Sequence, residues 1–491
     1  MNTVQLIIYD QLNINYLSSN TDNYIFLYSQ KNAIWPYGTI NLNPHSKVLE
    51  YAMTKAFVDD IKKNFPQKNS EWIMCDNYYD WLVIYCESQN ISIIYIMKPS
   101  ENYIYEHFVS IAKKLKEKNI CIEFLPNTQF ILDHEDFLAI YPDKLPVMEN
   151  FYRMMRKRFD VLMVWDKPFW WKRNYDSENR SFDKSHIWHI NHPKFNHKYL
   201  SQAQEFLGVD ICDIDYPIDR KQALWLLDSF VDNHLDNFGR LEDAMYSDDG
   251  LVYHSLVSTS LNFWLLSPIE VINKISEADT DINNKEWFIR QILGWREYMY
   301  HFFHFYKEDI YQQNFNNYNT SLPYWFWEGG SDNLQMNCIN KVLHQVKTSW
   351  YSHHITRLMI IGNFCLLAGI DPHDVNKRFW EMYVDAFEWV VSPNVLAMSQ
   401  FSDGGRLATK PYISSANYIN NMSNYCKTCI YDPKEKYWPN ACPFNYLYRN
   451  FVDKNRNLFW RQPYIVSNLQ KVDIDKIKTM SDTFIKKLTD S

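Results

Sequence analysis

A change in hydrophobic periodicity near residue 130 is the feature that most constrains the fold of this chain. Before it, short apolar runs alternate with amphipathic segments such as KVLEYAMTKAFVDDIKKNF. The apolar runs are VQLIIYD, NYIFLYS, WLVIYC, SIIYIM and CIEFLP. This alternation predicts βαβ units on a parallel sheet. After about residue 215, apolar residues recur at three- and four-residue steps, as in WFIRQILGWREYMYHFFHFY, which predicts an all-α half.

The segment between these halves is basic and aromatic. It reads FYRMMRKRFDVLMVWDKPFWWKRNYDSENR, and we expect a helix followed by a long ordered loop. Loops of this length inside a folded chain usually have a function, and the aromatic content argues against disorder. We therefore expect an α/β domain over residues 1–135, a linker with this loop over 136–210, and a helical domain over 211–491.

The charge and hydropathy of the chain restrict its partners and location. Lys and Arg number 50 against 58 Asp and Glu, so the formal net charge is -8. Any DNA contact must therefore come from a local basic patch. No stretch reaches the roughly 18 consecutive apolar residues of a membrane span, and the N-terminus lacks the basic region of a signal peptide. We expect a cytoplasmic monomer with no membrane segment.

Three of the nine cysteines lie close together, in SNYCKTCIYDPKEKYWPNACP. Cys426 and Cys429 form a C-x-x-C pair, and Cys442 follows in a turn rich in Pro and Asn. In a reducing compartment, clustered thiols are more often metal ligands or catalytic groups than disulfides. A fourth ligand must come from elsewhere, and Cys338 and Cys365 are both available. The spacing alone leaves zinc, a redox disulfide and an iron-sulfur centre open.

A second group of polar residues lies in SHHITRLMIIGNF and YVDAFEWVVSPNVLAMSQFSDGG. His353, His354 and Arg357 fall within about one helical turn, and Asp385 can pair with Arg357 from the next helix. A lone His on a helix is usually structural. Two adjacent ones cannot both face the same core, so a structural and a functional role both stay open.

Several longer motifs, in the same order, resemble the iron-sulfur bacterial branch of the cryptochrome/photolyase family, the prokaryotic (6-4) photolyases. They are HSLVSTSLN, RQILGWREYMY, HHITRLMIIGNFCLLAGIDP, PNVLAMSQFSDGG, ATKPYISSANYINNMSNYCKTC and NACPFNYLYRNF. The similarity runs from YDQL near the start to RQPY near the end. It implies the cryptochrome/photolyase fold, with a Rossmann-like α/β antenna domain followed by an all-α FAD-binding domain.

The resemblance also implies a ligand set for the cysteines. Four cysteines of the family hold a [4Fe-4S] cluster, and the matching positions are Cys338, Cys426, Cys429 and Cys442. Cys365 falls where the family needs no ligand. Such a cluster would connect a late loop to an earlier helix and stabilise the fold rather than carry out the photochemistry.

FAD is the catalytic cofactor that the resemblance implies. Ser255 and Ser258 match positions beside its phosphates, although without the resemblance they are typical of a helix cap. Arg357 and Asp385 match the pair beside the isoalloxazine ring. The remaining positions assigned to the cofactor are Asn394, Trp295 and Glu297.

The implied activity is that of a DNA photolyase, the light-driven reversal of (6-4) pyrimidine-pyrimidone photoproducts in UV-damaged DNA. Photoexcited reduced FAD donates one electron to a flipped-out lesion, and a histidine moves a proton to it. His353 and His354 match the active-site histidines. Other positions lining the lesion pocket are Asp243, Met398, Tyr412 and Tyr418. DNA phosphates would be bound by scattered cations, which are otherwise a solvated face: Arg156, Lys157, Arg158, Lys172, Arg173, Arg180, Arg406 and Lys410.

The sequence departs from the family in several places. The electron-relay aromatics are replaced by Arg378, Phe379 and Phe387, none of which is easily oxidised, and Val391 stands where a Glu is expected beside the flavin. Asp10 and Gln11 match residues that bind the antenna, 6,7-dimethyl-8-ribityllumazine, but the rest of that segment differs. A role for Mg²⁺ is left open.

Two other classes of function compete with the enzyme. One is a cryptochrome-type blue-light photoreceptor that binds the same cofactors, repairs nothing and acts through a partner protein. The other is a zinc-stabilised helical nucleic-acid binder without flavin.

Overall fold

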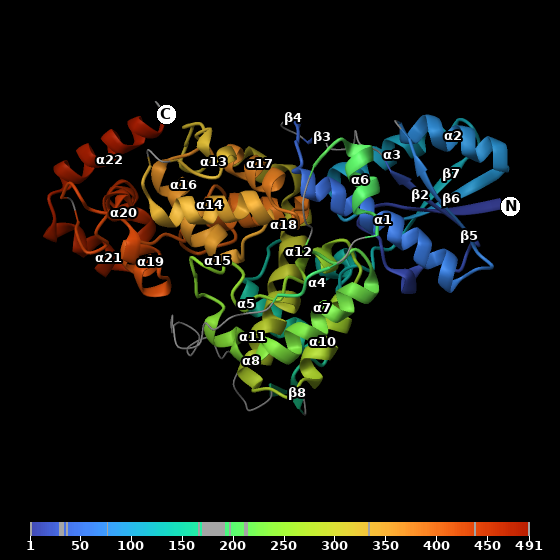
Figure 1. Ribbon diagram of the computed structural model, residues 1–491, viewed down its shortest axis with the longest axis horizontal. Helices are drawn as coiled ribbons and strands as arrows, with labels where there is room; N and C mark the ends of the chain where they lie inside the picture. The colour runs from blue at the N-terminus through green and yellow to red at the C-terminus, as the bar shows by residue number, and fades with distance from the viewer. Residues whose placement is uncertain are drawn as a thin grey trace.

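The structure is a computed structural model of the 491-residue chain. It describes residues 2–28, 34–35, 38–75, 77–164, 167–168, 192–195, 198–210, 215–331, 334–436 and 438–489. In Figure 1 the N-terminal sheet lies at one end of the molecule and the last helices lie at the other. Helices α7, α8, α10 and α11 form a lobe below them. No helix in the described ranges combines the length and apolar character needed to span a lipid bilayer.

The N-terminal sheet is parallel throughout, in the order β5-β2-β1-β6-β7. Its strands are β1 (Asn2–Ile7), β2 (Asn23–Tyr28), β5 (Asn69–Met74), β6 (Ile91–Met97) and β7 (Cys121–Leu125). Its helices are α1 (Pro44–Asn64), α2 (Tyr78–Gln89) and α3 (Asn102–Lys116). The strand order runs outward from β1 in both directions, as in doubly wound α/β domains. The predicted parallel α/β arrangement is confirmed.

Successive residues of a strand face opposite sides of the sheet, so the central strands contribute to two apolar clusters. Val4 and Leu6 of β1 pack with α2 and α3 in one apolar cluster. Tyr24 and Phe26 of β2 pack on the other face with α1, in a cluster that continues into the helical half of the chain. The second face therefore joins the sheet to the helices that follow.

One of the five predicted apolar runs was assigned wrongly. WLVIYC was counted with the strands, but it lies inside helix α2. Asn77 caps the start of this helix by accepting hydrogen bonds from the backbone of Tyr79 and Asp80, and Asn90 ends it in the left-handed region. The periodicity of a short apolar run does not distinguish a helix from a strand, so the assignment depends on the capping residues at its ends. The edge strand β5, NSEWIM, was missed because its first half is polar and leaves only three apolar residues in a row.

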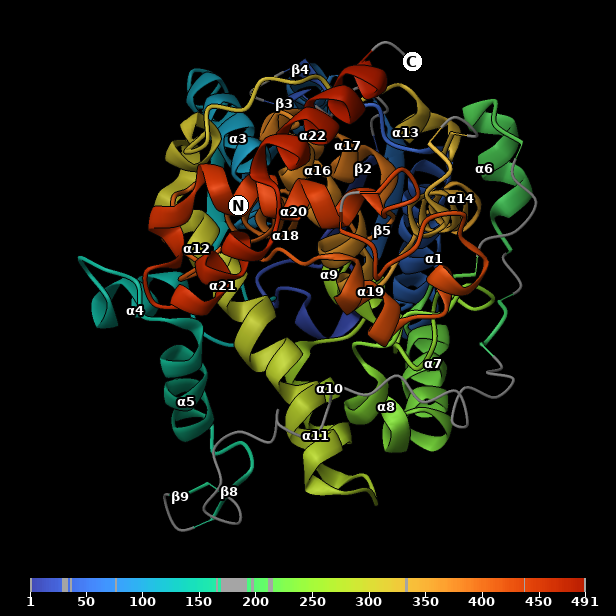
Figure 2. The ribbon, with the colours of Figure 1, turned by 90° about the vertical axis from the view of Figure 1, so that its left-hand side faces the viewer.

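The rest of the chain is mostly helical. Two helices precede residue 160, α4 (His134–Ile140) and α5 (Met148–Arg158), and two short hairpins pair β3 (Ile34–Trp35) with β4 (Gly38–Thr39) and β8 (Met163–Val164) with β9 (Lys167–Pro168). The later α-helices are α6 (Leu200–Leu207), α7 (Arg220–Asn233), α8 (Leu235–Leu241), α9 (Ser258–Asn262), α10 (Pro268–Glu277), α11 (Ile282–Ile289), α12 (Glu297–Tyr306), α13 (Trp325–Glu328), α14 (Asn337–Ser349), α15 (His354–Thr356), α16 (Asn363–Ala368), α17 (Pro372–Met382), α18 (Glu388–Ser392), α19 (Ala416–Met422), α20 (Pro443–Lys454), α21 (Pro463–Ser467) and α22 (Ile474–Thr489). Figure 2 shows α20 and α22 together at the C-terminal end.

Two stretches with apolar residues at three- and four-residue steps, NCINKVLHQVKTSWYSHHITRLMIIGNFCLLAG and KRFWEMYVDAFEWVV, each predict one helix, but both are interrupted. The run from 337 to 369 breaks at Trp350, which has a positive φ of 53°. The run from 377 to 391 breaks between α17 and α18. Three segments are wound as π-helix: η5 (Arg290–Arg296), η7 (Arg357–Gly362) and η8 (Pro393–Ser399). Such segments frequently occur at functional sites, and each of the three contains or adjoins a predicted site residue.

Buried carboxyl groups connect the sheet domain to the helices. Glu101, at the start of α3, accepts a hydrogen bond from the backbone N–H of Glu388 at 2.7 Å and another from the hydroxyl of Tyr9. Glu388 in turn accepts from the Tyr311 hydroxyl at 2.9 Å and from the backbone N–H of Tyr103 at 3.2 Å. Burial raises the pKa of Glu101 to about 8 and that of Glu388 to about 7. Both groups are therefore protonated over part of the neutral range.

These raised pKa values predict that the protein loses stability as the pH rises from about 4.5 to about 8. Above pH 4.5 an unfolded glutamate releases its proton while folded Glu101 keeps it, so the folded state binds more protons and the unfolding free energy falls as pH rises to about 8. We expect Glu101→Gln to flatten the decline between pH 6 and 9 by about 2 kcal/mol, since one pKa unit is about 1.4 kcal/mol. Urea unfolding at a series of pH values measures this. Glu106→Gln, on the exposed side of α3, is the control, and a Glu101→Gln protein with the wild-type pH dependence would contradict the assignment.

Candidate functional site

An ion pair between Arg357 and Asp385 lies at the centre of the candidate site. Nη2 of Arg357 is 3.0 Å from Oδ1 and 3.2 Å from Oδ2 of Asp385, and Nε donates to the backbone carbonyl of Ser352 at 2.6 Å. The side chain of Asp385 is 9% exposed and that of Arg357 is 19% exposed. The predicted pairing of these two residues is confirmed.

The break between α17 and α18 is what brings Asp385 to this position. Helix α9 holds the residue from the other side, because Ser258 donates its hydroxyl to Oδ2 at 2.8 Å and Asn262 donates its amide to the backbone carbonyl at 2.9 Å. Three segments that are distant in sequence therefore meet at this ion pair: α9, the connection after α17, and η7 with the residues just before α15.

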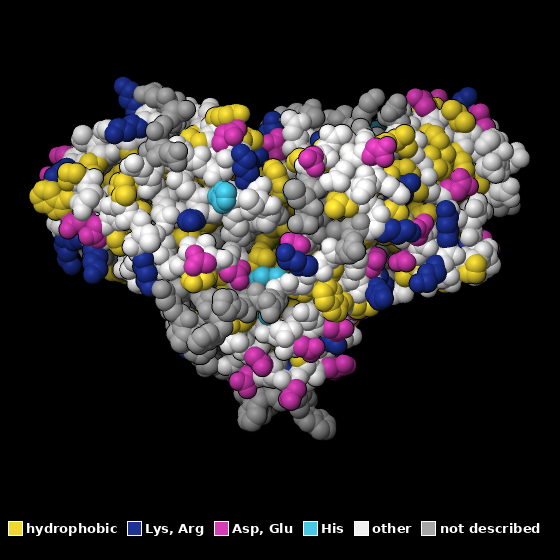
Figure 3. Space-filling view, in the orientation of Figure 1, with side chains coloured by type: hydrophobic (Ala, Val, Ile, Leu, Met, Phe, Trp, Pro, Cys, Tyr) yellow, Lys and Arg dark blue, Asp and Glu magenta, His cyan; other side chains and the backbone are white. Residues whose placement is uncertain are grey.

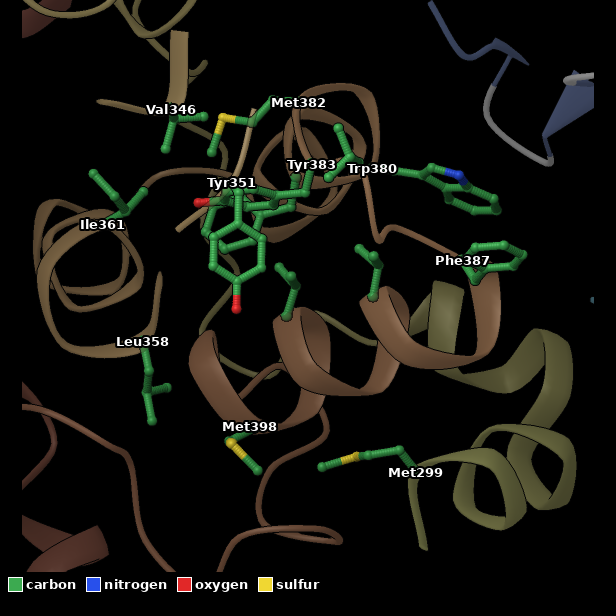
Figure 4. Close-up of a cluster of buried hydrophobic side chains, with 14 of the residues drawn as sticks. Met299, Val346, Tyr351, Leu358, Ile361, Trp380, Met382, Tyr383, Phe387 and Met398 are labelled. Carbon is green, nitrogen blue, oxygen red and sulfur yellow. The ribbon is translucent and has the colours of Figure 1, made fainter. Parts of the chain in front are cut away.

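Two tyrosines surround the guanidinium. The centre of the Arg357 guanidinium lies 3.8 Å from the ring centroid of Tyr383 and 5.1 Å from that of Tyr351. Figure 4 shows these rings next to each other in the buried cluster that also contains Met398. Burial alone would lower the pKa of Arg357, but Asp385 and the two tyrosine hydroxyls reverse this effect and raise it. The guanidinium is thus held as a cation with one face against aromatic carbon.

The predicted histidine pair adjoins this ion pair. His353 is fully buried, and neither ring nitrogen has a hydrogen-bond partner among the described residues. Burial, together with His254, His354 and Arg357, lowers its pKa well below the usual value. The side chain of His354 is exposed, yet enough protein surrounds it that desolvation and the Arg357 cation lower its pKa to about 4. The two neighbours therefore differ: one ring is enclosed and the other is open to a ligand.

The residues predicted to line the lesion pocket come from three segments. Met398 is buried in η8, while Tyr412 and Tyr418 are half-buried before and within α19. Asp243 lies in the turn that follows α8, where the backbone N–H of Met245 donates to the carbonyl of Met422 at 2.9 Å. This bond places the turn beside the end of α19. The lesion-pocket role of these residues stays a prediction.

The predicted cofactor residues differ in how many of their polar side-chain atoms already form hydrogen bonds within the protein. Ser255 and Trp295 are half-buried, and the Ser255 hydroxyl accepts from the backbone N–H of Val257 at 3.5 Å. Asn394, at the start of η8, donates to the carbonyl of Val390 at 2.7 Å. The Glu297 prediction is less well supported, because its carboxylate is fully buried and accepts from the backbone of Ile131 and Leu132 and from Arg296. That carboxylate joins residues 131 and 132, at the end of the α/β segment 1–135, to α12.

Two hydroxyl groups on α9 were not predicted. Thr259 and Ser260 are fully buried, and among the described residues their hydroxyl oxygens have no hydrogen-bond partner. Unpartnered buried hydroxyls are costly, so these two are candidates for binding a polar ligand. Both residues belong to the motif HSLVSTSLN, which could have identified them, but only its first two serines were assigned a role.

The four predicted metal-binding cysteines line one hollow. Cys338 at the start of α14, Cys426 and Cys429 around η9 (Tyr425–Thr428), and Cys442 before α20 surround about 310 Å³ of space that protein atoms leave unfilled, part of it open to solvent. Aromatic and aliphatic side chains complete the wall: Met336, Ala416, Ile419, Tyr425, Tyr431 and Phe444. All four thiols are free of disulfides. The fifth candidate, Cys365, is buried elsewhere.

The chemistry of this hollow favours a positively charged occupant. Burial raises the pKa of Cys426 to about 11, and burial together with the neighbouring thiols raises the pKa of Cys338 and Cys442 further. Adjacent thiolates repel each other unless a cation lies between them. Yet no three Cys, His, Asp or Glu side chains among the described residues are placed to hold a single metal ion. Asn337 ties the loop to α14 independently, by donating to Tyr425 at 2.8 Å and to Thr428 at 3.1 Å.

The two predicted antenna residues lie at the end of β1. Asp10 accepts from the backbone N–H of Ser100 at 3.2 Å and from its hydroxyl at 2.5 Å, while Gln11 donates to the carbonyl of Met97 at 2.8 Å. Both side chains are buried, and each keeps one oxygen atom without a partner among the described residues. Burial raises the pKa of Asp10 to about 6. Much of the segment that follows β2 lies outside the described residues.

The positions of the missing electron relay are all buried. Arg378 donates to the carbonyl of Phe326 at 3.1 Å, and its guanidinium lies 4.9 Å from the ring of Trp327. Phe379 and Phe387 are in the apolar core, as is Val391. The oxidisable aromatics that a relay of the usual kind needs are therefore absent from these positions.

Several cations predicted to contact DNA are already paired. Arg156 was assigned wrongly, because it is buried and donates to the carbonyls of Val161 and Leu162. Arg158 pairs with Asp136 and Arg406 with Asp309, each at 2.5 Å. Exposed Lys157 and Lys410 fit the prediction, whereas Lys172, Arg173 and Arg180 lie outside the described residues. In Figure 3, Lys and Arg side chains are interspersed with Asp and Glu on the face shown.

Comparisons with known proteins place this site in context. The family described as "Deoxyribodipyrimidine photo-lyase-related protein" matches residues 52–207. A protein of Agrobacterium fabrum named "(6-4) photolyase" is 39% identical over 388 residues, which cover 75% of this chain and 76% of that protein. An uncharacterized protein of Acanthamoeba polyphaga mimivirus is 43% identical over 101 residues, or 21% of this chain and 75% of that protein.

Solved structures share the architecture. A bacterial class III photolyase from Agrobacterium tumefaciens has a TM-score of 0.56 at 14% identity, covering 81% of this chain and 80% of that chain. A cryptochrome from Synechocystis has a TM-score of 0.58 at 12% identity, covering 86% of this chain and 88% of that chain. At such identities the likeness concerns the fold alone, and the predicted cryptochrome/photolyase fold is confirmed.

We expect Asp385→Asn to destabilise the protein by about 2 kcal/mol, because it leaves a partly buried Arg357 cation without its counter-ion. Ser258→Ala, which removes one neutral donor from the same carboxylate, should cost about 1 kcal/mol. Urea unfolding of both variants compares the two effects. A smaller loss for Asp385→Asn than for Ser258→Ala would show that the ion pair does not stabilise this region.

Proposed function

We propose that this chain, which belongs to the cryptochrome/photolyase family, is a DNA photolyase that uses light to revert (6-4) photoproducts. The observation that carries the proposal is one buried arrangement: the Arg357–Asp385 pair beside an enclosed His353 and an accessible His354. The 39% identity to a (6-4) photolyase over three quarters of the chain supports the reaction.

The residues around this arrangement fit FAD. Arg357 offers a cation, and α9 offers two buried hydroxyls that have no partner among the described residues, on Thr259 and Ser260. Ser255, Ser258, Trp295 and Asn394 would complete the binding residues. When bound and reduced, FAD would supply the electron for repair after it absorbs light. Arg357 would stabilise negative charge beside it, because a cation fixed in a partly dry site acts more strongly than one in water.

His354 is the proposed proton donor. Its ring can be reached from solvent, while the ring of His353 cannot. In the free protein His354 is neutral at pH 7, since its pKa is lowered to about 4 by desolvation and the Arg357 cation. Negative charge from a bound DNA phosphate acts in the opposite direction and raises the pKa of an imidazole. Substrate binding would therefore supply the protonated form that the reaction needs.

We expect His354→Ala to lower repair at least 100-fold while leaving the FAD content unchanged, because general acid catalysis contributes about 10² to 10⁴ in rate. The measurement is blue-light repair of an oligonucleotide that carries one (6-4) lesion, with the flavin fully reduced. His344→Ala, on the exposed side of α14, is the matched control. Unaltered turnover in His354→Ala would assign the proton to another group. A wild-type protein that repairs nothing would favour the photoreceptor alternative.

We infer that Cys338, Cys426, Cys429 and Cys442 hold a [4Fe-4S] cluster. In such a cluster each thiolate binds a different iron atom, so the sulfur atoms stand further apart than around one ion. What supports the proposal is that four free cysteines, one on α14 and three in the loop before α20, line one hollow. Iron and sulfide content separates this cluster from the structural zinc alternative, whose ligands converge on one centre. The cluster would connect the loop before α20 to α14 and add folding free energy there.

Substituting two buried cysteines tests the cluster. Cys338→Ala should give protein that is insoluble or has lost its iron, because one cluster ligand is missing. Cys365→Ala should keep its iron, since Cys365 does not line the hollow. Iron and sulfide analysis with a visible spectrum measures both variants. An iron-replete Cys338→Ala protein would transfer the ligand role to Cys365.

The antenna proposal rests on fewer residues. Asp10 and Gln11 each offer one buried oxygen without a partner among the described residues, which fits the hydrogen-bond donors of 6,7-dimethyl-8-ribityllumazine. We infer that this chromophore binds the α/β domain of residues 1–135, that the linker covers 136–210, and that FAD binds residues 211–491. UV-damaged DNA is the proposed partner of the helical domain. The described residues add no support for Mg²⁺.

A further inference from the structure

We propose that His254 is a positioning residue for the histidine pair, and that its ring, stacked on His353, fixes the imidazole orientation used in repair. This inference rests on the proposed function. The two rings have centroids 4.4 Å apart and an angle of 17° between their planes. His254 precedes α9 and His353 precedes α15, so two segments distant in sequence supply one stacked pair.

The orientation of His254 is itself fixed by the backbone. Its Nε2 lies 3.1 Å from the carbonyl oxygen of Glu242. A carbonyl oxygen can only accept, so Nε2 carries the hydrogen. Burial lowers the pKa of His254 to about 4, and the neutral ring therefore has a bare Nδ1. The Phe238 ring also contacts this imidazole, in an edge-to-face arrangement with centroids 5.9 Å apart and planes at 86°.

His353 lacks such an anchor of its own. Both of its nitrogens are buried, and neither finds a partner among the described residues. Hydrogen bonds therefore do not set its ring plane in the free protein, and stacking on His254 does. Because ring nitrogens lie at the edge of an imidazole, a partner on its face restrains the ring and leaves both nitrogens available to substrate or His354. A misplacement of about 1 Å in an active site can cost 100-fold in rate.

The stack also separates the roles of the two active-site histidines. A proton on either stacked ring raises the energy of a proton on the other, and the Arg357 cation acts on both. The pair His254 and His353 is thus held neutral. The pKa of His354 is also lowered, to about 4, but its exposed ring is the one that a bound DNA phosphate can reach and help to protonate. His353 then acts as a neutral hydrogen-bonding group, and His254 acts through it.

Two substitutions at His254 separate the contribution of the stacked ring from that of the N–H donor. His254→Leu removes both the stacked ring and the N–H donor, whereas His254→Phe keeps a ring. We expect His254→Leu to slow repair at saturating lesion DNA by about 10-fold or more, with FAD content and the Kd for lesion DNA within about twofold of wild type. His254→Phe should recover most of that loss. His344→Leu, on the exposed side of α14, is the control and should repair as wild type does.

Hydrogen-deuterium exchange at the imidazole C2 carbon, read by mass spectrometry in the dark and without DNA, gives a second measurement. Exchange at His353 should speed up in His254→Leu and stay slow in His254→Phe and His344→Leu. The proposal is overturned if His254→Leu repairs like wild type, if its loss follows a matching loss of FAD, or if exchange at His353 does not change. A wild type that repairs nothing overturns the repair function instead, and the exchange result still decides on the stack.

Discussion

The ion pair between Arg357 and Asp385 is the interaction on which the organisation of the helical half depends. It joins η7 to the connection between α17 and α18, and the same carboxylate receives the hydroxyl of Ser258 from α9. In a charge pair with so little exposure to solvent, the attraction offsets the desolvation penalty only when further hydrogen bonds satisfy the remaining polar atoms. Here those bonds come from α9 and from the carbonyl of Ser352. Local breaks in the helices are therefore needed to form the site, because unbroken helices would carry Asp385 away from Arg357.

Much of the architecture could be predicted from the sequence, and the errors have physical causes. Parallel strands and amphipathic helices follow from periodicity alone. The helix breaks cannot be predicted from periodicity, because the apolar pattern continues through Trp350 and through residues 383–387 although the helices end there. WLVIYC was misassigned because a fully apolar run has no polar face to show its period. Arg156 was misassigned because charge in a sequence does not reveal burial.

The site itself was only partly accessible to sequence reasoning. Arg357 and Asp385 could be paired from their chemistry, and His353 and His354 stood out as neighbours. The position of His254 beside His353 could not be derived, because stacking between residues far apart in the chain depends on tertiary packing. Thr259 and Ser260 were hidden for a similar reason: hydroxyls are common in helix caps, and only their buried, unpartnered state in the described structure distinguishes them.

The three π-wound segments have a geometric consequence for the whole chain. Each residue advances an α-helix by about 100°, so one extra residue in a turn rotates everything beyond it relative to everything before it. Segment η5 lies directly before α12, whose first residue, Glu297, binds the backbone of residues 131 and 132. The rotation of α12 about its own axis, relative to residues 131 and 132, is thus set by the length of a single turn. Conservation of chain length in this turn should matter as much as conservation of its side chains.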